Sequence, residues 1–176
     1  MVVKKKITAV LRFFIPTFVA IGIAFLLFQV LFGLVNVPTT SMANTIPANS
    51  LSLMIRSRLL FNGLQRGDII VFQPTALNTD TGKAEDSRIP LVKRIVGMPG
   101  DTIEIKAGVV YLNGAPYNEE WLAETPEELD FGPYHVPEDS FFVLGDNRNH
   151  SIDSRYWKNP FVSVESVIGK IVCTFK

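Results

Sequence analysis

The sequence contains one long uncharged segment, and no other feature limits the possible folds of the chain more strongly. No charged residue occurs between Phe13 and Ile55, and residues 13–37 consist mainly of Phe, Ile, Leu, Val, Ala and Gly. A helix over residues 13–37, at about 1.5 Å per residue, reaches roughly 37 Å, which is more than the ~30 Å hydrocarbon core of a bilayer. We therefore predict one membrane-spanning helix over residues 13–37.

The charges around this segment are distributed unequally. Four of the 17 basic residues lie within residues 1–12, before every acidic residue, so the rest of the chain has 13 basic and 17 acidic side chains. The positive-inside rule then places residues 1–12 in the cytoplasm and residues 38–176 on the outer side of the membrane. An acidic outer part does not suit binding of nucleic acid, and the lipid bilayer is the partner that the span predicts.

A cleaved secretory peptide also begins with basic residues followed by an apolar run. Its apolar core is shorter, about 7–15 residues, and ends in a small-x-small cleavage site. Here the run ends in residues 34–38, Leu-Val-Asn-Val-Pro, which contain no such site. The length of the run and its end favour a retained anchor.

The part after the anchor has the periodicity of short strands. Polar stretches over 74–90 and 117–137 are predicted as loops, with a possible short helix over 119–129, and Asn113-Gly114 is a hairpin signal. The predicted strands are 50–55, 68–72, 91–96, 102–106, 109–112, 141–144 and 167–175. The predicted fold class is therefore mainly β, an antiparallel barrel-like β domain behind one N-terminal transmembrane helix.

Few residues are available to bind a metal. Cys173 is the only cysteine, which excludes an intrachain disulfide and a cysteine-based metal site. It lies in the alternating segment 171–175, which predicts a buried and inert thiol. The two histidines, His135 and His150, do not have the spacing of metal ligands. We expect neither a metal nor a cofactor.

Two residues are candidates for nucleophilic chemistry. Ser41 follows the span directly, although a serine in a polar turn is usually structural. Lys93 lies in a predicted strand whose period of two places it on the face of Leu91 and Ile95, with Arg94 on the other face. Charges of this kind often guard an edge strand. An apolar pocket would instead lower the lysine pKa from about 10.4 to about 7–8, so that a neutral amine activates a serine hydroxyl.

A third segment, residues 145–155, is densely polar and follows the apolar strand 141–144. It is either an ordinary solvated loop or a buried segment whose polar groups bond to one another, because burial without such bonds is costly. Asp153 and Arg155 are two residues apart and would point to the same side of an extended chain, which allows them to pair.

The order of these segments resembles the bacterial type I signal peptidases. The correspondence runs from the anchor to about Arg155 and includes Ser-Met-x-x-Thr-Ile at 41–46, Arg-Gly-Asp-Ile-Ile-Val-Phe at 66–72, Lys-Arg-Ile-Val-Gly-Met-Pro-Gly-Asp at 93–101 and Gly-Asp-Asn-Arg-x-x-Ser-x-Asp-Ser-Arg at 145–155. The resemblance implies these roles: Ser41 as nucleophile, Lys93 as general base, Ser151 as the residue that orients the lysine, the Thr39 hydroxyl and the Ser41 N–H as oxyanion hole, and Asp153 with Arg155 as a brace of the site.

The same resemblance implies a membrane-anchored serine endopeptidase that removes signal peptides from exported preproteins. Its substrates would have small residues at the first and third positions before the cut, and it would lie in the bacterial cell membrane with its N-terminus in the cytoplasm. This sequence departs from the family at Asn44, where proline is usual. Proline would stiffen the turn, so Asn44 either loosens Ser41 or is held by its own Asx hydrogen bonds.

Other functions are open to the same residues. A Ser-His-Asp protease would use His150 with Asp146 or Asp153, but both histidines lie in polar loops. An anchored β domain that only binds partners would make Lys93 a guard charge and would treat the three motifs as accidental. Related enzymes with a similar dyad cleave themselves or conjugation proteins. A LexA-like repressor would need a DNA-binding module, for which the chain has no room.

Overall fold

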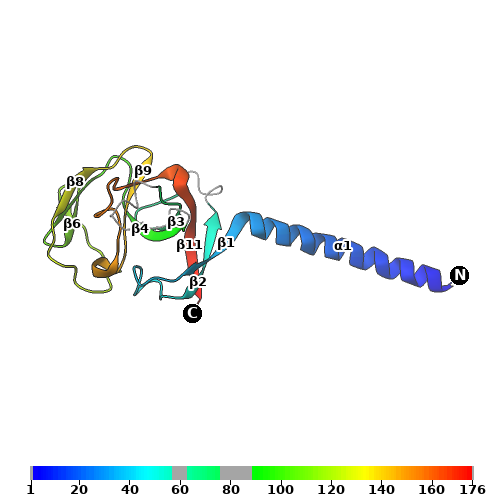
Figure 1. Cartoon of the computed structure of the whole chain (residues 1–176). Helices are drawn as coiled ribbons and strands as arrows, with labels where there is room; N and C mark the ends of the chain where they lie inside the picture. The colour runs from blue at the N-terminus through cyan, green and yellow to red at the C-terminus, as the bar shows by residue number, and fades with distance from the viewer. Residues whose placement is uncertain (1, 57–62, 76–88, 176) are drawn as a thin grey trace.

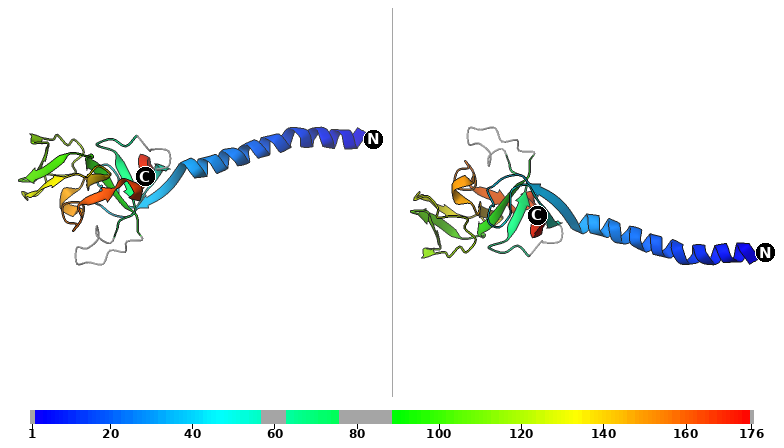
Figure 2. Two further views of the ribbon diagram at one scale, coloured as in Figure 1. Left: turned by 90° about the horizontal axis from the view of Figure 1, so that it is seen from above. Right: turned by 90° about the horizontal axis from the view of Figure 1, so that it is seen from below.

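The computed structural model describes residues 2–56, 63–75 and 89–175, and its N-terminal part is one long helix. Helix α1 (Val2–Leu31) includes an 18-residue window, Phe14–Leu31, with a mean hydropathy of 2.3, and none of this window is buried. α1 stands away from the β domain in every view (Figures 1 and 2). A helix that is apolar on all sides and uncovered by protein suits a lipid environment, and 18 residues reach about 27 Å.

The helix ends at Leu31, six residues before the end of the predicted span, because the next segment is a strand. β1 (Phe32–Val37) pairs antiparallel with β2 (Ser50–Arg56) over its whole length, which gives its backbone groups partners outside a helix. The two strands pack closely, since a Cβ at Gly33 would lie 2.6 Å from the Met54 side chain. An apolar run alone does not distinguish a helix from a strand, which explains the difference.

The rest of the described chain is mainly β and forms two antiparallel sheets. The seven-stranded sheet has the order β1-β2-β11-β3-β4-β9-β10, with β3 (Ile69–Phe72), β4 (Leu91–Gly97), β9 (Ser140–Leu144), β10 (Phe161–Ser163) and β11 (Val167–Phe175). The four-stranded sheet has the order β7-β6-β5-β8, with β5 (Thr102–Lys106), β6 (Val109–Leu112), β7 (Ala115–Pro116) and β8 (Phe131–His135). The described residues also include the short 3-10 helices η2 (Arg148–His150) and η3 (Val164–Ser166). The predicted class, mainly antiparallel β with one N-terminal apolar helix, is confirmed.

All the strands predicted from the sequence form, and the structure adds β1, β7, β8 and β10. β8 lies in a stretch predicted as a loop, because Gly132 and Pro133 interrupt its strand pattern. The segment 119–129 forms turns and bends and no helix. The hairpin signal is correct: Asn113 and Gly114 have φ of 52° and 84° and join β6 to β7, as a type I′ turn requires.

The two sheets share an apolar core. The cluster that joins them contains buried side chains from β4, β5, β6 and β9, together with Val136. These side chains are Val96, Ile103, Ile105, Val110, Val136, Phe142 and Leu144. β4 and β9 therefore have fixed positions; β4 carries Lys93, and β9 leads into the polar segment 145–155.

Cys173 is exposed, contrary to the prediction of a buried thiol. The register of β11 against β2 shifts between Ile171 and Cys173. A bulge of this kind interrupts the alternation of inward and outward side chains, so the pattern in the sequence assigned Cys173 to the wrong face.

Candidate active site

Ser41 lies in a tight turn between β1 and β2. The N–H of Ala43 donates to the carbonyl of Thr40 at 2.9 Å, and the N–H of Ile46 donates to the carbonyl of Met42 at 2.8 Å. The side chains of Met42 and Ile46 are fully buried in a cluster with residues of β1, β2, β3 and β4. Met42 and Ile46 thus anchor the turn, and Ser41 itself is buried.

β4 carries Lys93 to this turn. The strand lies inside the seven-stranded sheet, between β3 and β9, and its residues from Val92 onward are buried. Nζ of Lys93 lies 2.8 Å from Oγ of Ser41, although the two residues are 52 positions apart in the sequence. An interior strand does not need guard charges, so the edge-strand interpretation of Lys93 is wrong.

Thr39 lies beside the nucleophile candidate. Its Oγ1 is 3.2 Å from Oγ of Ser41, within hydrogen-bonding distance, and either hydroxyl is able to donate. The next residue, Thr40, contributes its backbone carbonyl to the turn, where it accepts from the N–H of Ala43. The arrangement leaves the Thr39 hydroxyl close to the atoms that would react, and its role in an oxyanion hole stays a prediction.

The segment 145–155 encloses the turn from the other side. The backbone N–H of Asn147 donates to the carbonyl of Ser41 at 3.1 Å, and its side-chain amide donates to the carbonyl of Thr40 at 3.2 Å. A Cβ at position 145 would lie 2.6 Å from the Ser41 carbonyl oxygen, so only glycine allows this approach. The segment is therefore a buried, internally bonded part of the site and not a solvated loop.

Ser151 does not make the expected hydrogen bond to Lys93. Its hydroxyl is buried and has no hydrogen-bond partner among the residues that the structure describes. The hydroxyl packs beside the backbone of Gly145, whereas Nζ of Lys93 is directed at Ser41. Ser151 is thus close to the turn, but its orienting role stays a prediction.

Asp153 and Arg155 form the ion pair that their spacing suggested. Nε and Nη2 of Arg155 lie 2.8 and 3.0 Å from the two carboxylate oxygens, and the N–H of Gly145 donates to Asp153 at 3.0 Å. Burial alone would raise the pKa of Asp153, but the charge and hydrogen bonds of Arg155, together with the Gly145 bond, outweigh it and hold the pKa below its ordinary value. The pair therefore fixes Gly145, which contacts the turn that carries Ser41.

A second buried ion pair lies on the opposite face of β4 and was not predicted. Nε and Nη2 of Arg94 donate to both carboxylate oxygens of Asp146, at 2.7 and 2.5 Å. Arg94 also donates to the Gly67 carbonyl at 2.6 Å and to the Thr45 hydroxyl at 3.2 Å, and it lies 4.3 Å from the centroid of the Trp121 ring. An arginine inside an apolar strand signals a buried acid, but only the fold selects Asp146.

The stretch before β8 is also tied to the segment 145–155. Arg148 and Glu119 form an ion pair in which both side chains are buried. The Asn149 side chain accepts from the N–H of Glu127 at 2.9 Å and donates to the carbonyl of Thr125 at 3.1 Å. This predicted loop is thus held against the site by bonds that its sequence does not reveal.

The geometry does not support a Ser-His-Asp arrangement. His150 is exposed, and its Nε2 lies 3.8 Å from Glu124. The two acids considered for such a triad, Asp146 and Asp153, are bound to Arg94 and Arg155. The side chain that the structure brings to the Ser41 hydroxyl is the Lys93 amine.

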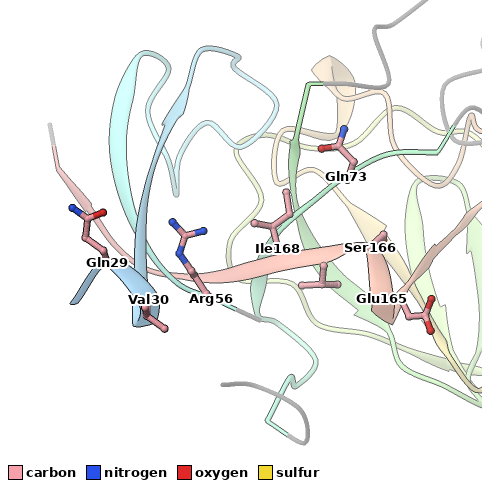
Figure 3. Close-up of a pocket in the computed structure, with 8 residues that line it drawn as sticks. Gln29, Val30, Arg56, Gln73, Glu165, Ser166 and Ile168 are labelled. Carbon is pink, nitrogen blue, oxygen red and sulfur yellow. The ribbon is translucent and has the colours of Figure 1, made fainter. Parts of the chain in front are cut away.

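A cavity of about 530 Å³ lies where the end of α1 meets the β domain (Figure 3). It is lined by Gln29, Val30, Arg56, Gln73, Glu165, Ser166, Val167 and Ile168, and so by none of the residues around Ser41. Within the described ranges, no group of three or more His, Cys, Asp or Glu side chains is placed to hold a metal ion.

A lysine amine held against a serine hydroxyl is an arrangement of nucleophilic catalysis with an amine base, so the fold and the site define a candidate serine hydrolase. The family model described as signal peptidase, peptidase S26, matches residues 10–176. The chain therefore belongs to the signal peptidase family S26.

Two relatives with similar sequences agree with this assignment. A protein named signal peptidase I from Leptolyngbya laminosa is 39% identical over 140 residues, which cover 79% of this chain and 66% of that relative. Signal peptidase I P from Bacillus subtilis subsp. natto is 33% identical over 180 residues, covering 94% of this chain and 91% of the relative. A crystal structure of a signal peptidase I from Enterococcus faecalis V583 is 31% identical, with a TM-score of 0.48, covering 63% of this chain and 98% of that one. The chain thus spans just under two thirds of the length of the Leptolyngbya relative.

Proposed function

We propose that this chain is a membrane-anchored serine endopeptidase that removes N-terminal signal peptides from exported preproteins. The observation that carries the proposal is the 2.8 Å contact between the Ser41 hydroxyl and the Lys93 amine, both buried, in a member of the signal peptidase family. No metal or cofactor takes part in the proposed reaction.

The reaction is acyl transfer through a covalent intermediate. Neutral Lys93 accepts the Ser41 proton at Nζ while Oγ forms a bond to the scissile carbonyl carbon. The oxyanion receives hydrogen bonds from the Thr39 hydroxyl and the Ser41 N–H. Lys93 then gives its proton to the leaving amine as the peptide bond breaks. A water molecule, deprotonated by Lys93, releases the signal peptide and restores Ser41.

Two opposing effects act on the protonation of the Lys93 amine. Burial disfavours the ammonium form, because the charge loses its hydration. The carboxylate of Asp153 acts in the opposite direction, but both of its oxygens are bound by Arg155, which offsets its charge. We propose that Ser151, whose buried hydroxyl lies beside this cluster, orients the amine once substrate is bound.

The substrates that we propose are extended peptide segments with small residues at the first and third positions before the cut. Main-chain bonds to a sheet edge would hold such a segment, and shallow pockets would select its side chains. The preference itself comes from the family resemblance.

The test of this function is cleavage of a preprotein by the purified chain in detergent, with Ser41→Ala and Lys93→Ala beside the wild type. Each variant should stay folded and lose cleavage, and the double variant should lose almost nothing more, since residues that act as a unit are not additive. Cleavage by a folded Lys93→Ala enzyme would contradict the dyad.

We further propose that residues 38–176 lie outside the membrane and that the N-terminus lies in the cytoplasm. The four basic residues before the span and the apolar window Phe14–Leu31 support this orientation. Protease added to intact spheroplasts should digest the β domain and leave the anchor. Protection of the β domain in intact spheroplasts, with digestion after lysis, would reverse the assignment.

A further inference from the structure

The turn that carries Ser41 contains a residue with an unusual backbone. Asn44, three residues after Ser41, has φ of 80°. Asparagine and glycine adopt this left-handed region far more readily than other residues, whereas proline is fixed near −65°. The turn around Ser41 therefore has a shape that the usual proline cannot adopt.

The Asn44 side chain reaches across to the segment 119–123. Its amide nitrogen lies 3.3 Å from the Trp121 carbonyl and 3.4 Å from the Leu122 carbonyl. The bonds are long, and one amide shared between two carbonyls bridges two segments that are 77 and 78 positions apart in the sequence. Asn44 is thus held by this distant segment and not by Asx bonds of its own turn.

Trp121 connects the same segment to the lysine strand. Its ring lies under the Arg94 guanidinium at 4.3 Å, and Arg94 donates to the hydroxyl of Thr45, the neighbour of Asn44. The Trp121 indole nitrogen is buried without a hydrogen-bond partner in the described part of the chain, so packing and the contact with Arg94 hold the ring.

The segment 119–123 also contacts the third motif. The N–H of Ala123 donates to the carbonyl of Asp146 at 3.1 Å. Asp146 is the partner of Arg94, and the next residue, Asn147, holds the carbonyls of Thr40 and Ser41. The segment 119–123 therefore contacts the turn that carries Ser41, the strand β4 and the segment 145–155.

We propose that Asn44 and Trp121 are positioning residues that together hold the Ser41 turn against β4 and so keep the Ser41 hydroxyl in contact with the Lys93 amine. This inference rests on the proposed function and adds two residues to it.

The test uses the purified full chain and compares kcat, KM and thermal unfolding of several variants in preprotein cleavage. Asn44→Pro should lower kcat by about 10²-fold, the loss typical of displacing a reacting atom by about 1 Å, while KM changes little. Asn44→Gly should lower kcat only about threefold: glycine adopts the same φ without strain, but it loses the side-chain bonds to the Trp121 and Leu122 carbonyls. Asn113→Pro is the matched control: Asn113 also has positive φ but lies in the β6–β7 hairpin, so this change should lower the unfolding temperature and leave kcat unchanged.

Trp121 provides an independent measurement should Asn44→Pro fail to fold. Trp121→Ala should lower kcat about tenfold. Trp121→Phe keeps an aromatic ring under Arg94, so its kcat should stay close to that of the wild type. In the double variant Asn44→Gly with Trp121→Ala, the loss in kcat should differ from the sum of the two single losses in free energy. A wild-type kcat in Asn44→Pro or in Trp121→Ala would overturn the inference, and so would strictly additive losses in the double variant. Failure of the wild type to cleave, or cleavage by Ser41→Ala, would instead overturn the proposed function.

Discussion

The two faces of β4 contain neighbouring cations in different surroundings. Lys93 and Arg94 are 4% and 8% exposed. Arg94 meets a carboxylate with both ends of its guanidinium, whereas the Lys93 amine contacts a neutral hydroxyl. A guanidinium stays protonated in proteins, while a buried amine changes its pKa readily. The comparison teaches that burial alone does not separate the two side chains, whereas the group that each one contacts does.

The largest effect is expected from removing the amine on the first face. Lys93→Met keeps a straight apolar side chain and should lower kcat by about 10⁴-fold or more without unfolding the domain. Lys93→Arg keeps the charge but not a base, so it should be equally inactive. Preprotein cleavage and circular dichroism measure the two properties. A kcat within tenfold of the wild-type value in either variant would show that the Lys93 amine is not needed for cleavage, and the two faces of β4 would then not differ in function.

On the second face, Arg94→Ala should act on stability. It leaves Asp146 buried and uncompensated, a change that typically costs about 3–5 kcal/mol of unfolding free energy. Arg94→Lys should cost less but still lose the bidentate contact. Urea unfolding followed by fluorescence measures both. A loss below about 1 kcal/mol in Arg94→Ala would show that this pair does not hold the site together.

Substitutions of Thr39 test the proposed oxyanion hole beside Ser41 and Lys93. Thr39→Val keeps the shape of the side chain and deletes the donor, so kcat should fall by about 10²–10³, or roughly 3–4 kcal/mol of transition-state stabilisation, with KM nearly unchanged. Thr39→Ser should recover most of the rate. Thr40→Val is the control. The reverse result, with Thr40→Val damaging and Thr39→Val harmless, would mean that the oxyanion-hole role implied by the family resemblance belongs to Thr40, one residue later in the sequence.

The smallest effect concerns acid stability. Because the folded-state pKa of Asp153 lies below its ordinary value, its pair with Arg155 stabilises the fold above the unfolded-state pKa of about 3.9. That contribution disappears as the pH falls through the folded-state pKa. Asp153→Asn should therefore be less stable than wild type at neutral pH, and the gap should narrow as the pH falls below about 4. A gap that stays constant with pH would exclude Asp153 as the titrating group.

Much of the architecture follows from local patterns in the sequence. The apolar run predicts α1, and alternation predicts β5, β6 and β11 with their observed bounds, because side chains in a strand point alternately to two faces. Asn113-Gly114 predicts its hairpin through the positive φ that both residues tolerate. Ser41 and Lys93 are identified as candidates by their motifs, and Asp153 with Arg155 by their spacing.

Other features depend on contacts between distant segments, and only the tertiary structure decides them. The end of α1 at Leu31 depends on β2, which pairs with the residues that follow. The choice of Asp146 as partner of Arg94, and the bridge from Asn44 to Trp121, join residues between 50 and 80 positions apart. The exposure of Cys173 follows from a bulge in the pairing with β2. A sequence pattern reports what each segment prefers, whereas these outcomes are set by the neighbour that the fold brings to it.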